Sequence, residues 1–228
     1  MENILEVKNL TVEFEREKII DSLSFAVRKK DVFIILGPNG AGKTILLKSI
    51  LNLIPYKGEV IWDKEIRIGY VPQRVPFVKD IPLNVSDFFK LKAVSSKTEK
   101  ALQMVGIKDK SFLKKSAGEL SSGQFQRILI AFELMGDPDV LILDEPMVGI
   151  DIEGEETIYS LLKRLRQEKE ITIILVTHDL STVFKEATNV LCINKKKMCY
   201  GAPRQVLSSE NLNALFGGEI NLYKHRHE

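Results

Sequence analysis

Eight consecutive residues, from Gly37 to Thr44, match the pattern G-x-x-x-x-G-K-[ST] at every fixed position. Glycines let the backbone bend around a phosphate chain, and successive N–H groups at a helix N-terminus attract anions. In this pattern Lys43 reaches the β- and γ-phosphates, and the Thr44 hydroxyl can hold Mg²⁺. The sequence therefore predicts that a nucleoside triphosphate binds to Gly37, Pro38, Asn39, Gly40, Ala41, Gly42, Lys43 and Thr44.

Two neighbouring carboxylates, Asp144 and Glu145, follow an apolar run at 140–143. A buried strand that ends in acidic residues is typical of phosphate-binding α/β proteins. We expect Asp144 to hold Mg²⁺ through water, and Glu145 to polarise the water that attacks the γ-phosphate. The alternative is an ordinary acidic pair at a strand end, which the phosphate loop makes the weaker interpretation.

The surrounding patterns predict the elements that position these residues. The wholly apolar run 32–36 indicates a buried parallel strand, and apolar residues at 47, 50, 51 and 54 indicate one face of the next helix. Apolar and polar residues alternate in 5–14 and 23–27, which predicts antiparallel strands. Further apolar runs at 171–176 and 190–193 alternate with helical patterns, so the main sheet should be mainly parallel.

Residues 75–118 differ in character from the flanking strands, because prolines interrupt them and polar, weakly amphipathic helical patterns follow. We expect an α/β fold of the phosphate-loop nucleotide-hydrolase type, with a mainly parallel sheet, an N-terminal antiparallel β-subdomain and an inserted α-helical subdomain. The whole chain, 1–228, forms one domain on this interpretation. Its ATP-binding core comprises 1–74 and 119–228, and the insertion comprises 75–118.

Composition excludes several classes of protein. The chain has 33 basic and 31 acidic residues and a net charge of +2, so no nucleic-acid partner is expected. No apolar run approaches the ~20 residues that span a membrane, and the N-terminus lacks the features of a signal peptide. We expect Cys192 and Cys199 to be reduced thiols. His225 and His227 offer a weak metal-binding pair on the tail, for which ordinary solvation is the stronger interpretation.

The segment Leu120-Ser121-Ser122-Gly123-Gln124 resembles the LSGGQ signature of the ABC-type ATPases, and its place relative to the other motifs matches. Gln73 is similar to the glutamine of the family's Q-loop, Asp151 to the aspartate of its D-loop, and His178 to its switch histidine. Phe14 lies where the family has an aromatic side chain that stacks on adenine. The resemblance covers essentially the whole chain, and these motifs are highly specific in combination.

The resemblance implies a catalytic group of Glu145, His178 and Gln73, and a Mg²⁺ site of Thr44, Gln73 and Asp144. It adds Phe14, Ser121, Gly123, Gln124 and Asp151 to the nucleotide-binding residues. Each has a simpler reading as well: Ser121 can cap its helix, His178 can be structural, and Phe14 can belong to the core. Ser122 replaces a signature glycine, and Met147-Val148 replaces the usual Thr-Ser before Gly149, but no catalytic group is lost.

The resemblance also implies a function for the ATPase. ATP and Mg²⁺ would join two copies into a homodimer, which would drive membrane permease subunits from the cytoplasmic face of the cell membrane. The chain is most similar to the ATPases of zinc and manganese importers, which work with an extracytoplasmic substrate-binding protein. The alternatives are a soluble ABC ATPase, for example of the iron–sulfur assembly type, and an ABC subunit for another cargo. We expect the permease to dock beside Gln73, on a surface that includes Phe77, Phe88 and Phe89.

Overall fold

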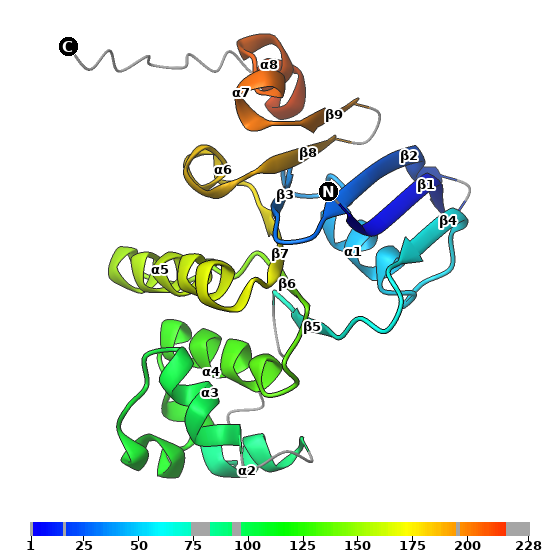
Figure 1. The fold of residues 1–228 in the computed structure, drawn as a ribbon. Helices are drawn as coiled ribbons and strands as arrows, with labels where there is room; N and C mark the ends of the chain where they lie inside the picture. The colour runs from blue at the N-terminus through cyan, green and yellow to red at the C-terminus, as the bar shows by residue number, and fades with distance from the viewer. Residues whose placement is uncertain (1, 16, 74–82, 93–96, 195–196, 218–228) are drawn as a thin grey trace, which may run out of the picture. The chain divides into compact units, whose positions relative to one another are not determined.

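The computed structural model describes residues 2–15, 17–73, 83–92, 97–194 and 197–217 (Figure 1). The chain divides into two compact units, one of residues 1–63 and 174–228 and the other of residues 64–173. Within the described ranges, none of the helices combines the length and the apolar character that a membrane span requires. The predicted insertion boundary at 75 lies outside the described residues, so the 75–118 subdomain stays a prediction.

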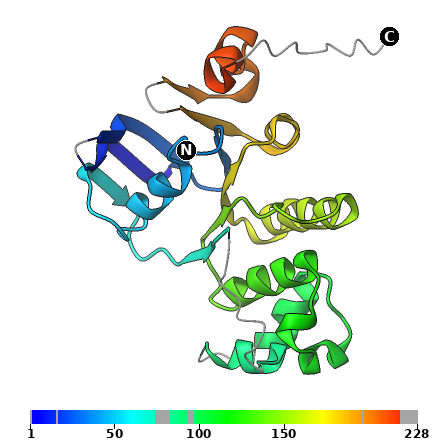
Figure 2. The same cartoon turned by 180° about the vertical axis from the view of Figure 1, so that it is seen from behind.

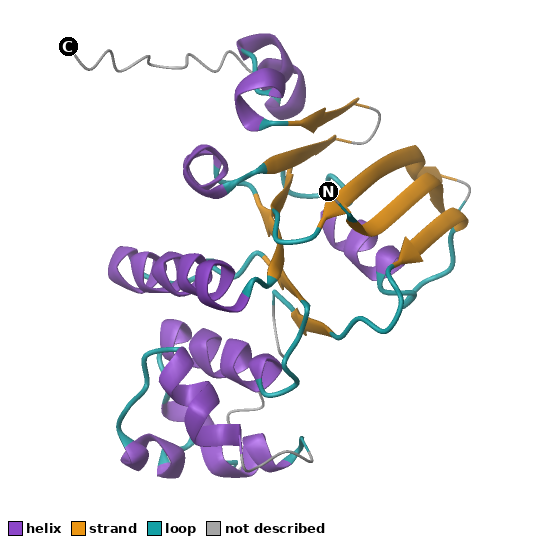
Figure 3. Ribbon diagram, in the orientation of Figure 1, coloured by secondary structure: helices purple, strands orange, loops and turns teal. Residues whose placement is uncertain are grey.

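The N-terminal part of the first unit is a three-stranded antiparallel sheet (Figure 3). Strand β1 (Asn3–Phe14) pairs with β2 (Glu17–Arg28) along one edge and with β4 (Lys57–Trp62) along the other. Leu5, Val7, Leu10 and Val12 are buried, and the two-residue period breaks between Val7 and Leu10, where the pairing with β2 shifts register. The expected antiparallel β-subdomain is therefore confirmed.

The rest of the first unit carries the phosphate loop. Strand β3 (Val32–Leu36) is buried at every residue and runs parallel to β8 (Asn189–Asn194), while β9 (Lys197–Gly201) pairs antiparallel with β8. The strand β7 (Thr172–Thr177) begins at the division between the units. Among the described residues this unit also contains α6 (Leu180–Glu186), α7 (Pro203–Val206) and α8 (Ser209–Phe216).

The helix after the phosphate loop, α1 (Lys43–Ile50), is shorter than the apolar spacing to residue 54 suggested. It ends because Asn52 adopts a left-handed backbone conformation, with φ of 56°. The Trp62 indole N–H donates to the Ile50 carbonyl at 2.8 Å and satisfies a carbonyl at the helix end. The tryptophan therefore ties the end of α1 to strand β4.

The second unit contains a parallel strand pair, β5 (Ile68–Val71) and β6 (Val140–Asp144), and the long helix α5 (Ile152–Lys169). It also contains α2 (Val85–Lys90), α3 (Thr98–Met104) and α4 (Ser122–Leu134), with short 3-10 helices at Lys110–Lys114 and Ala117–Glu119. The helices α2, α3 and α4 lie together in both views (Figures 1 and 2). Parallel strand pairs and helices in both units confirm the predicted α/β class.

An aromatic cluster in the second unit corrects part of the predicted docking surface. Phe89 is only 1% exposed, so it belongs to the core of the unit. Half-buried Phe88 contacts the ring of Phe132, with 4.6 Å between the centroids, and the Lys92 ammonium lies 4.4 Å from the Phe132 centroid. Phe77, the third predicted docking residue, lies outside the described residues.

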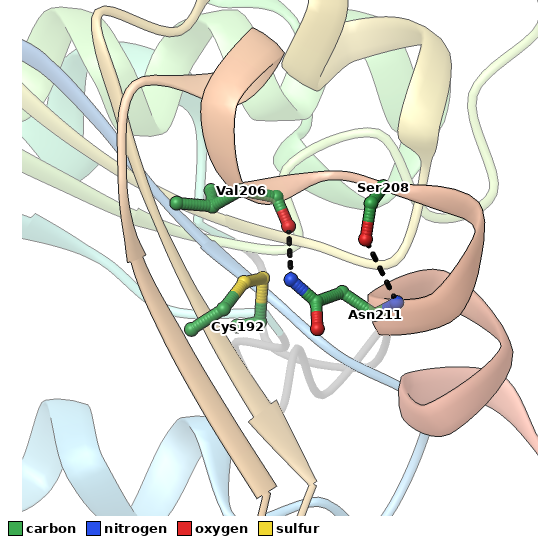
Figure 4. The surroundings of a disulfide bond; sticks show 5 residues. Cys192, Val206, Ser208 and Asn211 are labelled. Atoms are coloured by element: carbon green, nitrogen blue, oxygen red, sulfur yellow. Dashed lines mark hydrogen bonds between the residues drawn. A yellow bond between two sulfur atoms is a disulfide. The ribbon is translucent and has the colours of Figure 1, made fainter.

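The two cysteines form a disulfide, so the expectation of reduced thiols is wrong (Figure 4). Cys192 on β8 lies directly opposite Cys199 on β9, and their Cα atoms are 4.9 Å apart. Antiparallel strands bring opposed residues to this separation, which a disulfide can bridge. Only the register of the hairpin shows this pairing. Nearby, the Asn211 side chain donates to the Val206 carbonyl at 2.7 Å.

Candidate functional site

The phosphate loop lies between β3 and α1 and needs its glycines for two different reasons. A side chain at Gly37 would meet the Ile193 carbonyl oxygen of β8 at 2.2 Å, so the loop approaches that strand too closely for any Cβ. Gly40 and Gly42 have φ of 77° and 96°, in the left-handed region that glycine tolerates best. Gly42 is also the N-cap of α1. The loop therefore has the bent backbone that surrounds a phosphate chain.

The Lys43 side chain folds back over this loop. Its Nζ donates to the carbonyl oxygen of Gly37 at 2.9 Å and to that of Pro38 at 3.0 Å, and the residue is 5% exposed. The next residue, Thr44, is half-buried in the first turn of α1. A cation and a hydroxyl are thus held at the helix N-terminus, where the helix dipole also favours an anion.

The acidic pair stands at the end of β6 in the second unit. Asp144 is the last residue of the strand and is 1% exposed, and Glu145 directly after it is 9% exposed. Glu145 has φ of 46°, a left-handed conformation that is unusual for a residue with a long side chain. Strained backbone of this kind persists mostly at functional positions. Asp144 also affects a neighbouring group: burial first, and then the charge of Asp144, raises the pKa of Tyr70 to about 12.

The structure brings Gln73 to Glu145. The Gln73 Nε2 donates to the Glu145 Oε2 at 2.9 Å, so the predicted Q-loop glutamine holds the predicted base by one of its carboxylate oxygens. The amide nitrogen is used in this bond, which leaves the amide oxygen as the atom that can face a cation. Both residues belong to the second unit.

The signature residues form the N-terminus of α4. Ser121 is the N-cap, and its side chain accepts from the Gln124 backbone N–H while the Gln124 side chain accepts from the Ser121 backbone N–H, both at 3.2 Å. This reciprocal capping box is the structural role expected of a serine at a helix start. Ser121 is exposed and Gln124 is half-buried. The same helix end can therefore present polar groups to an outside ligand.

The D-loop aspartate caps the neighbouring helix. Asp151 is the N-cap of α5, and its Oδ1 accepts from the Gly154 N–H at 3.0 Å. A cavity of about 190 Å³ lies between the starts of α4 and α5, and its lining includes Ser121, Gly123, Asp151 and Gly154. The structure therefore gathers the signature and D-loop residues of one chain around one cavity.

The predicted switch histidine, His178, is exposed and follows β7. The next residue, Asp179, caps α6 and accepts from the backbone N–H groups of Ser181 and Thr182 at 2.9 and 3.1 Å. Burial opposes ionisation of Asp179, but hydrogen bonds from the Thr182 and Ser181 side chains outweigh it and lower the pKa of the carboxyl group. A fixed helix cap therefore anchors the backbone beside His178.

Phe14 is the last residue of β1 and is 49% exposed, so its ring is not part of the core. An exposed aromatic face at a strand end suits stacking on a nucleotide base, and adenine stacking stays a prediction for this residue. The lining of the cavity between α4 and α5 includes three residues that the sequence did not predict: Arg127, Gly154 and Thr157. A glycine three residues after a helix N-cap is a signal of close packing that the sequence did contain.

Oxygen donors suit the magnesium ion that ATP requires. Mg²⁺ prefers hard oxygen ligands, and the proposed residues offer a hydroxyl (Thr44), an amide oxygen (Gln73) and a carboxylate (Asp144). Asp144 is buried, which restricts the positions that its carboxylate can adopt. The positive-φ glycines of the loop and the Lys43 ammonium suit the phosphates themselves. The residues present therefore fit both groups.

Comparisons with known proteins agree with this site. The family model described as ABC transporter matches residues 20–148. The zinc import ATP-binding protein ZnuC of Wigglesworthia glossinidia brevipalpis is 35% identical over 232 residues, which cover 100% of both chains. ZnuC of Pasteurella multocida is 36% identical and covers 98% of this chain and 87% of its own length.

Solved structures show the same fold. An ABC transporter assigned to the metal-chelate type, in an inward-facing conformation, superposes with a TM-score of 0.86 at 28% identity over 95% of this chain and 90% of its own. The cbiO1 protein of Clostridium perfringens, part of the ABC transporter complex cbiONQ, gives 0.77 at 27% identity and 94% of both chains. The chain therefore belongs to the ABC transporter family, as an ATP-binding subunit that hydrolyses ATP.

Proposed function

We propose that this chain hydrolyses ATP to drive the import of a divalent metal cation through a membrane permease. Zinc is the cation that we propose as cargo. The observation that carries the proposal is the full-length similarity to proteins named as zinc import ATP-binding proteins, with no segment of the chain left over. The cargo is recognised by partners on this proposal, since the site described above binds nucleotide.

The residues take the following roles in the reaction. Lys43 and the N–H groups of the loop bind the β- and γ-phosphates, and Phe14 stacks on the adenine. Thr44, Gln73 and Asp144 would hold Mg²⁺, which neutralises charge on the phosphate oxygens when bound. Glu145 takes the proton of the attacking water, while Gln73 orients its carboxylate and His178 contacts the γ-phosphate.

Two copies of the chain complete each site in this proposal. Ser121 and Gly123 stand at an exposed helix N-terminus, where a γ-phosphate bound to another copy can be received. Gln124 shapes that terminus through the capping box, and Asp151 lies beside it at the same cavity. The homodimer forms on ATP binding, sits at the cytoplasmic face of the membrane, and acts with permease subunits and an extracytoplasmic substrate-binding protein.

The test is uptake of radioactive zinc by the source cells. Deleting the gene should abolish uptake at low external zinc, and the wild-type chain should restore it while Glu145→Gln does not. Competition with unlabelled Mn²⁺ measures whether manganese shares the route. If uptake of both metals survives the deletion, the chain serves another cargo or an iron–sulfur assembly system, and the import proposal is wrong.

A further inference from the structure

The signature helix and the D-loop meet at a contact between two glycines. A Cβ placed on Gly123 of α4 would lie 4.0 Å from the Cα of Gly154 on α5, and 3.4 Å from the Ile150 Cγ2. A Cβ on Gly154 would lie only 2.5 Å from the same Ile150 methyl and 2.7 Å from the Asp151 Oδ1. The Ile150 methyl group therefore lies close to both Gly123 and Gly154.

The same segment leads back to the predicted base. The Val148 N–H donates to the Glu145 carbonyl at 3.3 Å, and the Ile150 N–H donates to the Met147 carbonyl at 3.2 Å. Two successive turns thus connect Glu145 with Ile150, and Asp151 then caps α5. A displacement of the signature helix that moves Ile150 must also move Asp151 and strain the turns that follow Glu145.

We infer that Ile150 and Gly154 are positioning residues, which hold Ser121 and Asp151 in one rigid arrangement toward the ATP bound by a second copy. Neither residue touches nucleotide itself. The close approach of α4 and α5 requires a glycine at position 154. The fixed separation between the starts of these two helices requires the methyl group of Ile150. This inference rests on the shared-site dimer of the proposed function.

Three variants of the full chain test the contact as a double-mutant cycle. Gly154→Ala adds a methyl group that would meet the Ile150 Cγ2, and Ile150→Ala removes that methyl group together with the rest of the side chain beyond Cβ. Each single change should lower kcat by about fivefold to tenfold, because a misplacement of this size is costly in an oriented site. In the double variant the added methyl group no longer meets the Ile150 Cγ2, and only its approach to the Asp151 Oδ1 remains, so its loss of kcat should be smaller than the product of the two single losses.

The readouts separate positioning from simple loss of structure. The Kd of one protomer for ATP should stay unchanged in all three variants, since the phosphate loop is untouched. Gly136→Ala is the matched control, because Gly136 is exposed and a Cβ there would meet only the Glu133 carbonyl oxygen, at 3.4 Å. Its kcat and KM should equal those of wild type. If a single variant fails to fold, ATP hydrolysis by the double variant still tests the inference, because the inference requires the double variant to be active.

If the loss of kcat in the double variant equals the product of the two single losses, the inference is wrong. It is also wrong if the single variants raise KM and leave kcat unchanged. A separate measurement tests the shared-site dimer by itself: light scattering should show that Glu145→Gln forms an ATP-bound dimer. If that dimer is absent, the shared site of the proposed function fails. If the dimer forms and the cycle is multiplicative, only the inference about Ile150 and Gly154 fails.

Discussion

Gln73 and Glu145 are joined by a hydrogen bond of 2.9 Å, although 72 residues separate them in the sequence. The bond fixes one oxygen of the carboxylate that we propose as the base. Gln73 lies two residues after β5 and Glu145 directly after β6, so the bond joins the carboxyl ends of this parallel strand pair.

Glu145→Gln should bind Mg-ATP normally and hydrolyse it about 100-fold more slowly or worse, because the amide keeps the shape but loses the base. The variant can still accept the hydrogen bond from Gln73. ATP-bound dimer should accumulate and be visible by light scattering. A monomer with intact ATP bound would contradict the shared-site arrangement.

Lys43→Ala should weaken ATP binding at least about tenfold, since a hydrogen bond to a charged group contributes about 1.5–3 kcal/mol. Calorimetry of the isolated chain measures the affinity. The control is Lys48→Ala, which removes an exposed lysine from the last turn of the same helix and should leave the affinity unchanged. Near-normal ATP affinity in Lys43→Ala would refute the role of the loop.

Ser121→Arg should spare ATP binding by its own protomer and block hydrolysis, because a large cation would occupy the place of the partner's γ-phosphate. Loss of the cap alone costs about 1 kcal/mol of stability, so Ser208→Arg serves as a control. Ser208 caps α8 by the same kind of bond, to the Asn211 N–H, and its change should leave turnover intact.

Mixing Ser121→Arg with Lys43→Ala should partly restore hydrolysis. In a mixed dimer one site combines both lesions and the other site is intact. The measurement is ATPase activity of the mixture against each variant alone at the same total concentration. Complete inactivity of the mixture would show that the two sites do not work independently.

The purified chain should give no free thiol on alkylation in denaturant, and two after reduction, because the described pair Cys192 and Cys199 is bonded. Replacing both cysteines with serine should lower the free energy of unfolding by about 2 kcal/mol, as expected for a bond that closes a short loop. Thermal unfolding with and without reductant checks this value. Two reactive thiols before reduction would contradict the bond.

Phe89→Asp should destabilise the second unit by about 3–5 kcal/mol or prevent folding, because the ring is 1% exposed and contacts Phe88 and Phe132. Leu91→Asp is the matched control, since Leu91 directly follows α2 and is 69% exposed. Its free energy of unfolding should change by less than about 0.5 kcal/mol. Equal stability of both variants would show that Phe89 is not in the core.

Local patterns predicted the strand that precedes the phosphate loop and the antiparallel first sheet, because each follows from the pattern of apolar residues within one element. The capping role of Ser121 follows from a single position as well. Contacts between residues that lie far apart in the sequence could not be predicted from local patterns. The disulfide depends on hairpin register, and the burial of Phe89 depends on a ring supplied by α4. The bond from Trp62 to the end of α1 likewise joins two separate elements.

The position of Lys43 has a consequence for the binding of ligands. Its ammonium already binds two carbonyl oxygens of the loop, so an incoming anion must displace acceptors that are tethered at very high local concentration. The loop carbonyls thus hold the ammonium over the phosphate loop before a ligand arrives, and on binding they are exchanged for anionic phosphate oxygens, to which its hydrogen bonds are stronger.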